Sequence, residues 1–393
     1  MKPAKMTHTT LKSLAAAMLL PIIGIASTSC ERDEVLIDIV QSQVTEPVYT
    51  DVYGFYLLNE GNMGSNKSSI DYFDATKGIY YRNIYAARNP TVVKELGDVG
   101  NDIQIYGGKM YAVINCSHKV EVLTPDSAKR ITRIDIPNCR YVLGHGPHVY
   151  VSSYVGPVQI DPTAPRGAVF KVDTLSLAVV DTVEVGYQPE EMTIIGNNLY
   201  VANSGGYRVP DYDNTISVID LNTFEIADVI TVEQSANFHR LDHDSMGRLW
   251  LSSRGNYYGD FDSELFVIDP VGKQVIKTMG VPVSDMWADG DMLYVISTEW
   301  SYITGENTVS YAKVDMASME VLDRNIIKDG TDQLIKVPYG IAVDPVTKDF
   351  YVCDAKSYVV SGTIYCFGSD GILKWSQTTG QIPAHFAFYG RTE

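Results

Sequence analysis

The fold is decided by residues 192–201, Met192-Thr193-Ile194-Ile195-Gly196-Asn197-Asn198-Leu199-Tyr200-Val201. A short apolar run, a turn rich in Gly and Asn, and a second run centred on an aromatic residue follow one another directly. Gly and Asn supply the positive φ angles that a tight β-hairpin requires. The stretch therefore predicts two neighbouring antiparallel strands joined by a short turn.

The aromatic-centred second strand recurs along the chain. Its seven copies are residues 55–57, 110–113, 149–151, 199–201, 249–251, 293–295 and 350–352. Their spacing is irregular but centres on about fifty residues, a period typical of repeat architectures. In such folds each repeat buries its apolar face against its neighbours, so one domain can be much longer than usual.

The segments around each aromatic strand repeat too. An apolar strand precedes all copies except the first, as at residues 102–105. A longer loop leads to a third strand, as at residues 216–220, and a more polar fourth strand follows, as at residues 227–232. Four antiparallel strands in each of seven repeats predict an all-β fold, a seven-bladed β-propeller. An irregular pair of β-sandwiches is the alternative.

The two ends of the predicted propeller complement each other. Residues 385–390 resemble a first strand with no partners after it, and residues 53–57 resemble a second strand with no first. Joining them completes a blade with strands from both termini and removes the open sheet edges that invite aggregation. The predicted propeller spans residues 52–393.

Residues 1–29 predict a lipoprotein signal peptide. Lysines precede an apolar run at residues 14–26, which is too short to span a bilayer permanently. The run leads to a segment that resembles a lipobox, in which Cys30 is acylated, although Ser27 stands where leucine is usual. An ordinary signal peptide with an incidental Cys30 is the alternative.

Residues 30–51 are expected to be the lipid-anchored cysteine and an acidic linker. The acidic cluster at residues 31–34 resembles the surface-export signal of Bacteroidetes lipoproteins, and a solvated tether is the alternative. The expected location is the outer membrane, facing the cell exterior.

The composition of the chain limits the classes of partner that it is expected to bind. The net charge of −17 argues against nucleic acid or an anionic membrane surface, so the lipid anchor is the expected membrane contact. Cys116, Cys139, Cys353 and Cys366 lie in no metal-binding spacing, and their disulfide pairing stays open. Neither a nucleophile elbow nor a phosphate-binding loop is present. We therefore expect no catalytic residue, metal site or catalytic cofactor, and a protein that is not an enzyme.

Function is expected on the propeller face that carries the long loops. In a propeller, the loops from second to third strands and from fourth to first strands emerge together, and here they are rich in aromatic residues. Exposed aromatic residues on a rigid scaffold favour a binding face, whereas packing between loops is the alternative. The candidate ligand-binding residues are Arg140, Tyr154, Tyr187, Tyr207, Phe238, His239, Tyr257, Tyr258, Trp300, Tyr302, Tyr339, Tyr358 and His385.

The repeat resembles the YncE-like propellers at residues 199–203 and 216–221. Residues 57–64 and 69–73 resemble a lipoprotein branch of that group common in Bacteroidetes. That branch includes the BtuG-type propellers, which capture vitamin B12 and related corrinoids at the cell surface and deliver them to a TonB-dependent outer-membrane transporter. The resemblance implies capture of cobalamin or another corrinoid and a transporter as partner.

A corrinoid is a broad disc with an amide fringe, which suits a wide propeller face with aromatic surface and Tyr hydroxyls. His239 or His385 could approach the cobalt. A glycan or a peptide is the main competing ligand. A corrinoid predicts one broad axial site, whereas a glycan predicts an elongated groove away from the axis. A propeller lyase or lactonase is the third hypothesis and predicts a metal or acid–base cluster in the central channel.

Overall fold

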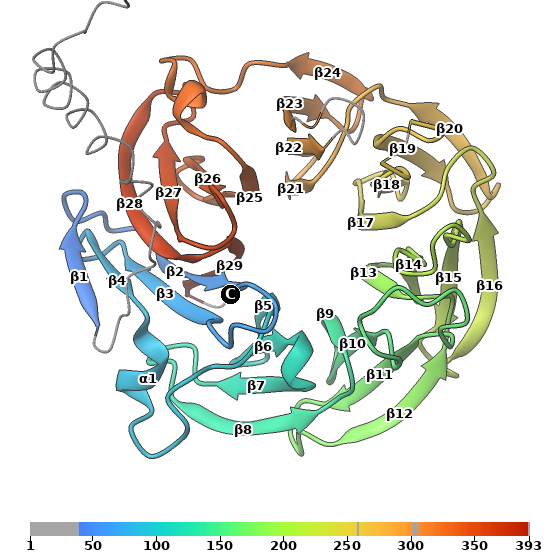
Figure 1. The fold of residues 1–393 in the computed structure, drawn as a ribbon, viewed down its shortest axis with the longest axis horizontal. Helices are drawn as coiled ribbons and strands as arrows, with labels where there is room; N and C mark the ends of the chain where they lie inside the picture. Colours follow the sequence, from blue (N-terminus) through green and yellow to red (C-terminus); the bar gives the residue numbers. More distant parts are fainter. Residues whose placement is uncertain (1–38, 258, 301–304, 306, 392–393) are drawn as a thin grey trace, which may run out of the picture. The chain divides into compact units, whose positions relative to one another are not determined.

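The computed structural model describes residues 39–257, 259–300, 305 and 307–391. These residues form seven antiparallel sheets around a central axis, and the innermost strands face that axis (Figure 1). The predicted seven-bladed β-propeller is confirmed. Residues 1–29 and Cys30 lie outside the described residues.

Each blade contains the four strands that the repeat predicts. The innermost strands are β29 (Pro383–Gly390), β5 (Gly100–Tyr106), β9 (Cys139–His145), β13 (Pro189–Ile195), β17 (Phe238–His243), β21 (Asp285–Asp289) and β25 (Pro338–Val343). The second strands are β2 (Val52–Asn59), β6 (Lys109–Ile114), β10 (His148–Ser153), β14 (Asn198–Asn203), β18 (Leu249–Ser253), β22 (Met292–Trp300) and β26 (Phe350–Asp354).

The two outer strands of each blade follow in chain order. The third strands are β3 (Ser69–Asp74), β7 (Lys119–Leu123), β11 (Ala168–Asp173), β15 (Thr215–Asp220), β19 (Glu264–Asp269), β23 (Asn307–Asp315) and β27 (Ser361–Phe367). The fourth strands are β4 (Ile79–Arg82), β8 (Arg130–Asp135), β12 (Val179–Glu184), β16 (Glu225–Thr231), β20 (Gln274–Thr278), β24 (Glu320–Asp323) and β28 (Leu373–Gln381).

Burial follows the predicted change from apolar to polar across a blade. Every residue of β18 is buried, whereas nearly all of β12 is exposed. The reason is packing between blades: Leu249 and Leu251 of β18 lie in one apolar cluster with Tyr200 of the preceding blade. Apolar burial of this kind contributes about 25 cal/mol per Å², so the hydrophobic strands occupy the middle of each sheet.

The termini close the ring as predicted. The C-terminal strand β29 pairs antiparallel with β2, and Tyr56 lies opposite Ala387 in this pairing. Figure 1 shows β29 beside β2, on the inner side of the blue N-terminal blade. The inner edge of that blade is thus made by the chain's last strand.

One part of the expected linker is structured. β1 (Val40–Gln43) pairs antiparallel with β4 and adds a fifth strand to the rim of the first blade. The outer edge of β4 offers unpaired backbone groups, and an edge of that kind recruits any nearby extended segment. Val44 N–H continues the pairing by donating to the Gly78 carbonyl at 2.9 Å. The structured region therefore begins before residue 52.

Short helical elements occupy some connections. They are α1 (Ile84–Arg88) and the 3-10 helices η1 (Asn115–Ser117) and η2 (Thr331–Leu334). Among the described residues no helix has the length and apolar content needed to cross a membrane.

The cysteines whose pairing the sequence left open form no disulfide in the structure. Cys353 lies opposite Ile364, while Cys366 lies opposite Tyr351, and both thiols are free. Cys116 and Cys139 are free as well.

Candidate functional site

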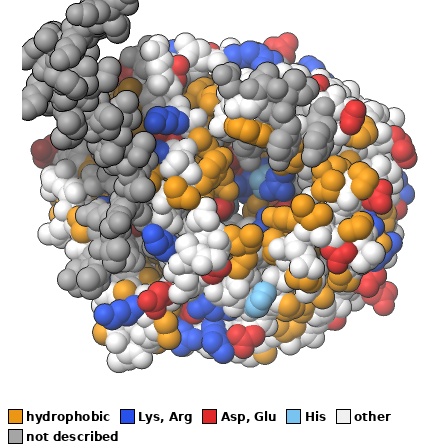
Figure 2. Space-filling model, viewed as in Figure 1, with side chains coloured by type: hydrophobic (Ala, Val, Ile, Leu, Met, Phe, Trp, Pro, Cys, Tyr) orange, Lys and Arg blue, Asp and Glu red, His pale blue; other side chains and the backbone are white. Residues whose placement is uncertain are grey.

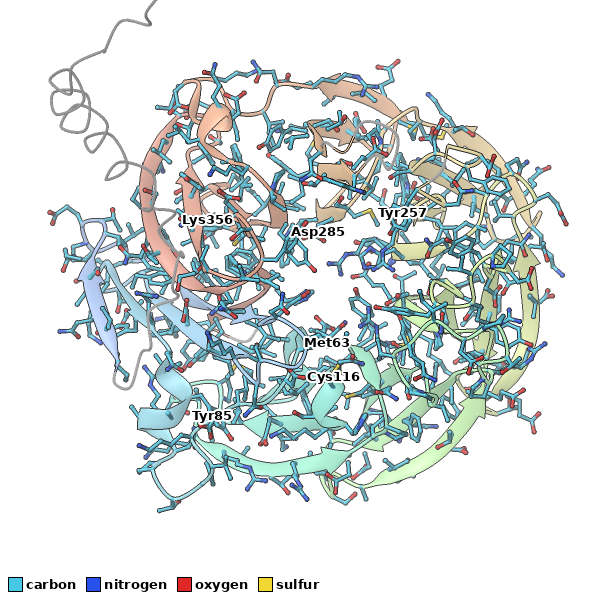
Figure 3. The ribbon with its side chains drawn as sticks, viewed as in Figure 1. Met63, Tyr85, Cys116, Tyr257, Asp285 and Lys356 are labelled. Carbon is cyan, nitrogen blue, oxygen red and sulfur yellow. The ribbon has the colours of Figure 1, made fainter. Side chains whose placement is uncertain are left out.

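A cavity of about 740 Å³ lies on the propeller axis, at the face where the long loops emerge. We call it the axial cavity. Every blade contributes to its lining, through Glu60, Cys116, Tyr154, Tyr207, Tyr257, Trp300 and Tyr358 among others. In Figure 2, hydrophobic side chains surround a central hollow that holds Lys or Arg side chains and a His. Figure 3 shows Met63, Tyr257 and Asp285 around the central opening and Tyr85 farther out.

Most of the sequence-predicted residues meet in this cavity. Those that line it are Arg140, Tyr154, Tyr207, His239, Tyr257, Trp300, Tyr339, Tyr358 and His385. Tyr257 and Trp300 keep 43% and 44% of their surface exposed and stand at the mouth, whereas Tyr154 and Tyr339 lie deeper. The predicted residues thus form an aromatic mouth and a polar floor.

Two predicted residues lie elsewhere. Phe238 is fully buried in the apolar cluster between two blades, because strand alternation turns it away from the axis and turns His239 toward it. Tyr187 lies outside the cavity lining, beneath the Arg208 guanidinium at 3.6 Å. Tyr258 and Tyr302 fall outside the described residues.

Irregular pairing of the inner strands aims polar side chains at the axis. The register against the second strand shifts at the same place in β5, β9, β13, β17, β25 and β29. A β-bulge of this kind bends the strand and turns an extra side chain. The bulged segments contain Asn101, Arg140, Tyr141, Glu190, Glu191, His239, Arg240 and Tyr339.

The sequence stabilises two of these bulges locally. The Ser152 hydroxyl accepts the Tyr141 N–H at 3.1 Å, and the Ser252 hydroxyl accepts the Arg240 N–H at 2.8 Å. Each serine stands on the second strand opposite a bulge and satisfies a backbone donor that the ladder leaves unpaired. The serines therefore help hold the functional side chains in position.

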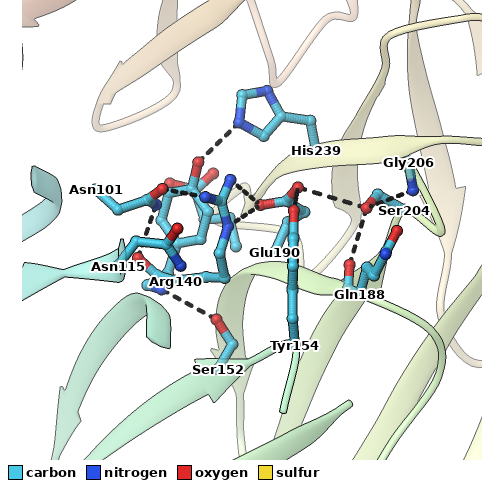
Figure 4. Close-up of polar contacts among 12 residues, drawn as sticks. Asn101, Asn115, Arg140, Ser152, Tyr154, Gln188, Glu190, Ser204, Gly206 and His239 are labelled. Atoms are coloured by element: carbon cyan, nitrogen blue, oxygen red, sulfur yellow. Dashed lines mark hydrogen bonds and ion pairs between the residues drawn. The ribbon is translucent and has the colours of Figure 1, made fainter. Parts of the chain in front are cut away.

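Glu190 is the centre of a buried polar network in the cavity wall (Figure 4). Arg140 donates to Glu190 Oε2 through Nε and Nη2, at 3.0 and 2.9 Å. The Tyr154 hydroxyl and Arg254 Nη1 donate to Glu190 Oε1, at 2.5 and 3.0 Å. Burial by itself raises the pKa of Glu190, but the two guanidinium groups outweigh it and the pKa is lowered. One carboxylate therefore fixes two arginines.

A second pair joins neighbouring bulges. The Tyr141 hydroxyl lies 2.7 Å from Nε2 of His239. Burial, followed by the positive charges of Arg254, Arg240 and Arg140, holds the pKa of His239 well below its usual range. Burial raises the pKa of Tyr141. At neutral pH the pair is therefore an uncharged imidazole beside an uncharged phenol.

On the other side of the axis, Glu60 joins two predicted residues. The Tyr339 hydroxyl donates to Glu60 Oε2 at 2.9 Å, and His385 Nε2 lies 3.0 Å from Glu60 Oε1. Glu60 lines the cavity from the end of β2. The carboxylate thus orients a phenol and an imidazole toward the same space.

Arg240 forms a layer beneath the cavity floor. Its Nε lies 2.9 Å from Asp285 Oδ1, and its Nη1 lies 3.4 Å from Glu191 Oε1. A second cavity, of about 370 Å³, opens on the far side of this layer and is lined by Glu191 and Trp287. Tyr141 lines both cavities. Burial raises the pKa of Glu191 to about 8.

Several cavity residues were missed from the sequence. They are Glu60, Asn101, Asn115, Tyr141, Asn237 and Arg254, together with Glu190 behind the wall. Aligning the first strands of the repeats would have found part of this set, because the position that holds His239 in one blade holds Glu190 and Arg140 in others. Arg254 directly follows β18, the second strand of its blade, and the residues around it form no motif that would mark it as a site residue.

The ligand types that the cavity can hold follow from this lining. Among the described residues, no group of three or more His, Cys, Asp or Glu side chains is arranged to hold a metal ion. The walls instead offer aromatic surface, amide groups and guanidinium donors. This combination suits a small organic molecule with polar groups.

Comparison with solved structures finds many similar chains. A quinonprotein alcohol dehydrogenase-like protein from Bacteroides thetaiotaomicron is 12% identical, with a TM-score of 0.58, over 86% of this chain and 79% of that one. A putative 6-phosphogluconolactonase from Bacteroides fragilis is 15% identical, with a TM-score of 0.58, over 88% and 100%. Hydrazine synthase from Kuenenia stuttgartiensis is 18% identical, with a TM-score of 0.53, over 68% and 76%. These identities show a common fold alone.

Sequence comparison identifies a family. Among curated proteins, none matches the chain significantly. The profile of the family described as a domain of unknown function, DUF5074, matches residues 53–373 and so reaches from the first propeller strand, β2, into the last blade. The chain therefore belongs to the DUF5074 family.

Proposed function

We propose that this protein captures a small molecule in the axial cavity, and that the molecule is cobalamin or a related corrinoid. The observation that carries the proposal is the cavity itself: all seven blades line one broad axial space. Pockets of this size with apolar walls and a few placed polar groups are typical of small-molecule sites.

The lining supports a corrinoid over a glycan. A glycan is expected in an elongated groove away from the axis, and this cavity is axial. Aromatic side chains such as Tyr257 and Trp300 at the mouth offer surface for a broad disc. Asn237 in the wall has an amide oxygen with no partner among the described residues, and such an acceptor matches the N–H groups of an amide fringe. The resemblance to BtuG-type propellers points to the same ligand.

The wider role that we propose is delivery. An acylated Cys30 would tether the propeller to the outer membrane, and a TonB-dependent transporter would receive the ligand. Capture in this scheme is binding without chemistry, so the protein is not an enzyme.

Isothermal titration calorimetry of residues 36–393 with cyanocobalamin tests the ligand. Stoichiometric heat is expected, and cobinamide as a second titrant shows whether the lower nucleotide contributes. Trp300→Ala and Tyr257→Ala should weaken binding about tenfold, as expected for aromatic anchors. Tyr49→Ala removes an aromatic side chain that is 81% exposed and lies outside the cavity lining, so it should bind as the unmodified protein does. No heat at micromolar protein excludes the corrinoid.

An enzyme of the lyase or lactonase type is a second candidate, favoured by one observation. The Tyr141–His239 pair is an acid–base cluster in the central channel, which that hypothesis predicts. Incubation with 6-phosphogluconolactone, the substrate class in the name of the Bacteroides fragilis structure, tests it. Hydrolysis that disappears in His239→Gln supports an enzyme, and a rate equal to the uncatalysed one counts against it.

A further inference from the structure

We propose that Arg254 and His239 form an oxyanion subsite on the floor of the axial cavity, which holds a carboxylate or phosphate group of the captured molecule. The subsite rests on the proposed function, because it needs a small molecule in the axial cavity. It adds the chemical group by which that molecule is held. Both residues line the cavity, and neither was given this role by the sequence.

His239 presents a donor that nothing in the protein uses. The side chain is only 7% exposed, and its Nδ1 has no hydrogen-bond partner among the described residues. The Tyr141 hydroxyl is a neutral phenol, and its proton needs an acceptor. The acceptor at hand is Nε2 of His239, at 2.7 Å. A neutral imidazole that accepts at Nε2 carries its hydrogen on Nδ1. That N–H is therefore buried and unpaired.

An unpaired buried donor has an energetic consequence. A donor left without an acceptor loses its hydration and gains nothing in return, so native proteins rarely keep one without a function. His239 lines the axial cavity, and its Nδ1 atom is itself covered by neighbouring atoms. An acceptor of the captured molecule that displaces this cover recovers the missing hydrogen bond.

Arg254 supplies the charge. Its Nη1 donates to Glu190 at 3.0 Å, and its side chain keeps 26% of its surface exposed. No acceptor for Nε or Nη2 is found in the part of the chain that the structure describes. One edge of the guanidinium is thus anchored to Glu190 while other donors stay open to the cavity. An anchored guanidinium with open donors is the arrangement that recognises oxyanions.

The charges that act on His239 favour an anion over a cation at this place, while the carboxylates of Glu60, Asp262 and Glu299 also line the cavity. Glu190 is shared by Arg140 and Arg254, so these three groups carry one net positive charge. The charges that act most strongly on His239 are all cationic, and Arg254 comes first among them. Repulsion of this kind keeps the imidazole neutral and attracts a negative group to the same place.

A neighbouring acceptor extends the subsite. Asn237 lines the cavity and is 1% exposed, and its Oδ1 has no partner among the described residues. Its Nδ2 donates to the Gly255 carbonyl at 2.9 Å, which fixes the orientation of the amide. A hydroxyl or amide N–H beside the anionic group of the ligand would complete this acceptor.

The subsite is tested with simple anions on residues 36–393. Sodium phosphate and sodium acetate, each compared with sodium chloride at equal ionic strength, should raise the melting temperature and shift the nitrogen-15 signal of His239 Nδ1. The stronger of the two anions identifies the group that the floor prefers. Arg254→Gln and His239→Gln should each lower the affinity for that anion about tenfold, as expected for a charge-assisted hydrogen bond.

A matched control separates site binding from general charge effects. Arg166→Gln removes an arginine whose side chain is 55% exposed and lies outside the cavity lining, so anion affinity should not change. If Arg254→Gln is too unstable to measure, Arg254→Lys keeps the charge and removes the planar fork, and it should also bind more weakly.

The outcomes separate the subsite from the corrinoid. Cyanocobalamin carries a phosphodiester that cobinamide lacks, so Arg254→Gln should weaken cyanocobalamin binding more than cobinamide binding. Anion binding without cyanocobalamin binding supports the subsite and excludes the corrinoid. The subsite is overturned if phosphate and acetate shift neither the melting temperature nor the His239 signal, or if Arg254→Gln and His239→Gln leave the anion affinities unchanged. Cyanocobalamin binding in either case leaves the proposed capture intact.

Discussion

At the scale of single residues, Glu190 and Glu191 are neighbours with opposite electrostatic environments. Glu190 accepts from Arg140, Arg254 and Tyr154, and its pKa is lowered. Glu191 Oε1 lies 3.4 Å from Nη1 of Arg240, and burial raises the pKa of Glu191 to about 8. Because the bulge in β13 turns them into different layers of the channel, adjacent carboxyls have different charges at neutral pH.

Glu190→Gln should lower the free energy of unfolding by about 3–5 kcal/mol, because it leaves two arginines without their shared counter-charge. Guanidinium chloride unfolding followed by tryptophan fluorescence measures the change. Glu184→Gln is the control, since its carboxylate is 73% exposed and lies 3.8 Å from Arg166, and no measurable change is expected. Equal stabilities of Glu190→Gln and the unmodified protein would show that the network contributes nothing.

Glu191 predicts a pH dependence. Its folded-state pKa of about 8 lies above the unfolded value of about 4.3. Its contribution to stability is therefore complete below the unfolded pKa and is lost as the pH rises through about 8. Glu191→Gln mimics the protonated form and cannot ionise. From acid to alkaline pH, its free energy of unfolding should therefore rise by about 1 kcal/mol relative to that of the unmodified protein. Denaturation from about pH 5 to 9 measures this, with the exposed Glu225→Gln as control. Parallel pH profiles for Glu191→Gln and the unmodified protein would contradict the assignment.

At the scale of strands, carboxylates staple the inner strand of one blade to that of the next. Asp102 accepts the Val142 N–H at 2.8 Å, and Asp285 accepts the Ile341 N–H at 3.0 Å. Glu191 accepts the Leu241 N–H at 2.8 Å in the same way. The repeat predicted the strands themselves. The bulges and staples were not predicted, because a bulge depends on the register between two strands of a blade and a staple on the packing of neighbouring blades.

Asp102→Ala should lower the free energy of unfolding by about 1–3 kcal/mol, because the Val142 N–H loses its acceptor inside the protein. Asp102→Asn keeps a side-chain oxygen at the same place and should recover most of the loss. Chemical denaturation of the two variants gives both values. Equal losses in Ala and Asn would assign the effect to the charge of Asp102 and not to the staple.

At the scale of the whole molecule, stability depends on closing the ring. β29 comes from the last residues of the propeller and pairs with β2 at its beginning. β1 only extends the rim of the same blade. The two ends of the chain therefore contribute strands of unequal importance to one sheet.

Deletion of residues 383–393 should abolish cooperative unfolding and produce aggregates, because it exposes the edge of β2 and opens the ring. Deletion of residues 1–49, which removes β1, should leave a monomer with a single unfolding transition. Size-exclusion chromatography and binding of a hydrophobic dye compare the two. A monomeric, cooperative protein without residues 383–393 would contradict the role given to closure.

The sequence by itself determined the propeller, its blade number and its closure, because hydrophobic periodicity and turn residues are local signals that repeat. It also placed Arg140, Tyr154 and His239 on the functional face. Only the tertiary structure decided which side chains meet on the axis: Glu190 and Arg254 are far apart in the chain and join through a buried ion pair. Phe238 was predicted beside His239, yet one position along a strand turns it into the core. Ring closure converts distant loops into one cavity, and no local pattern records that juxtaposition.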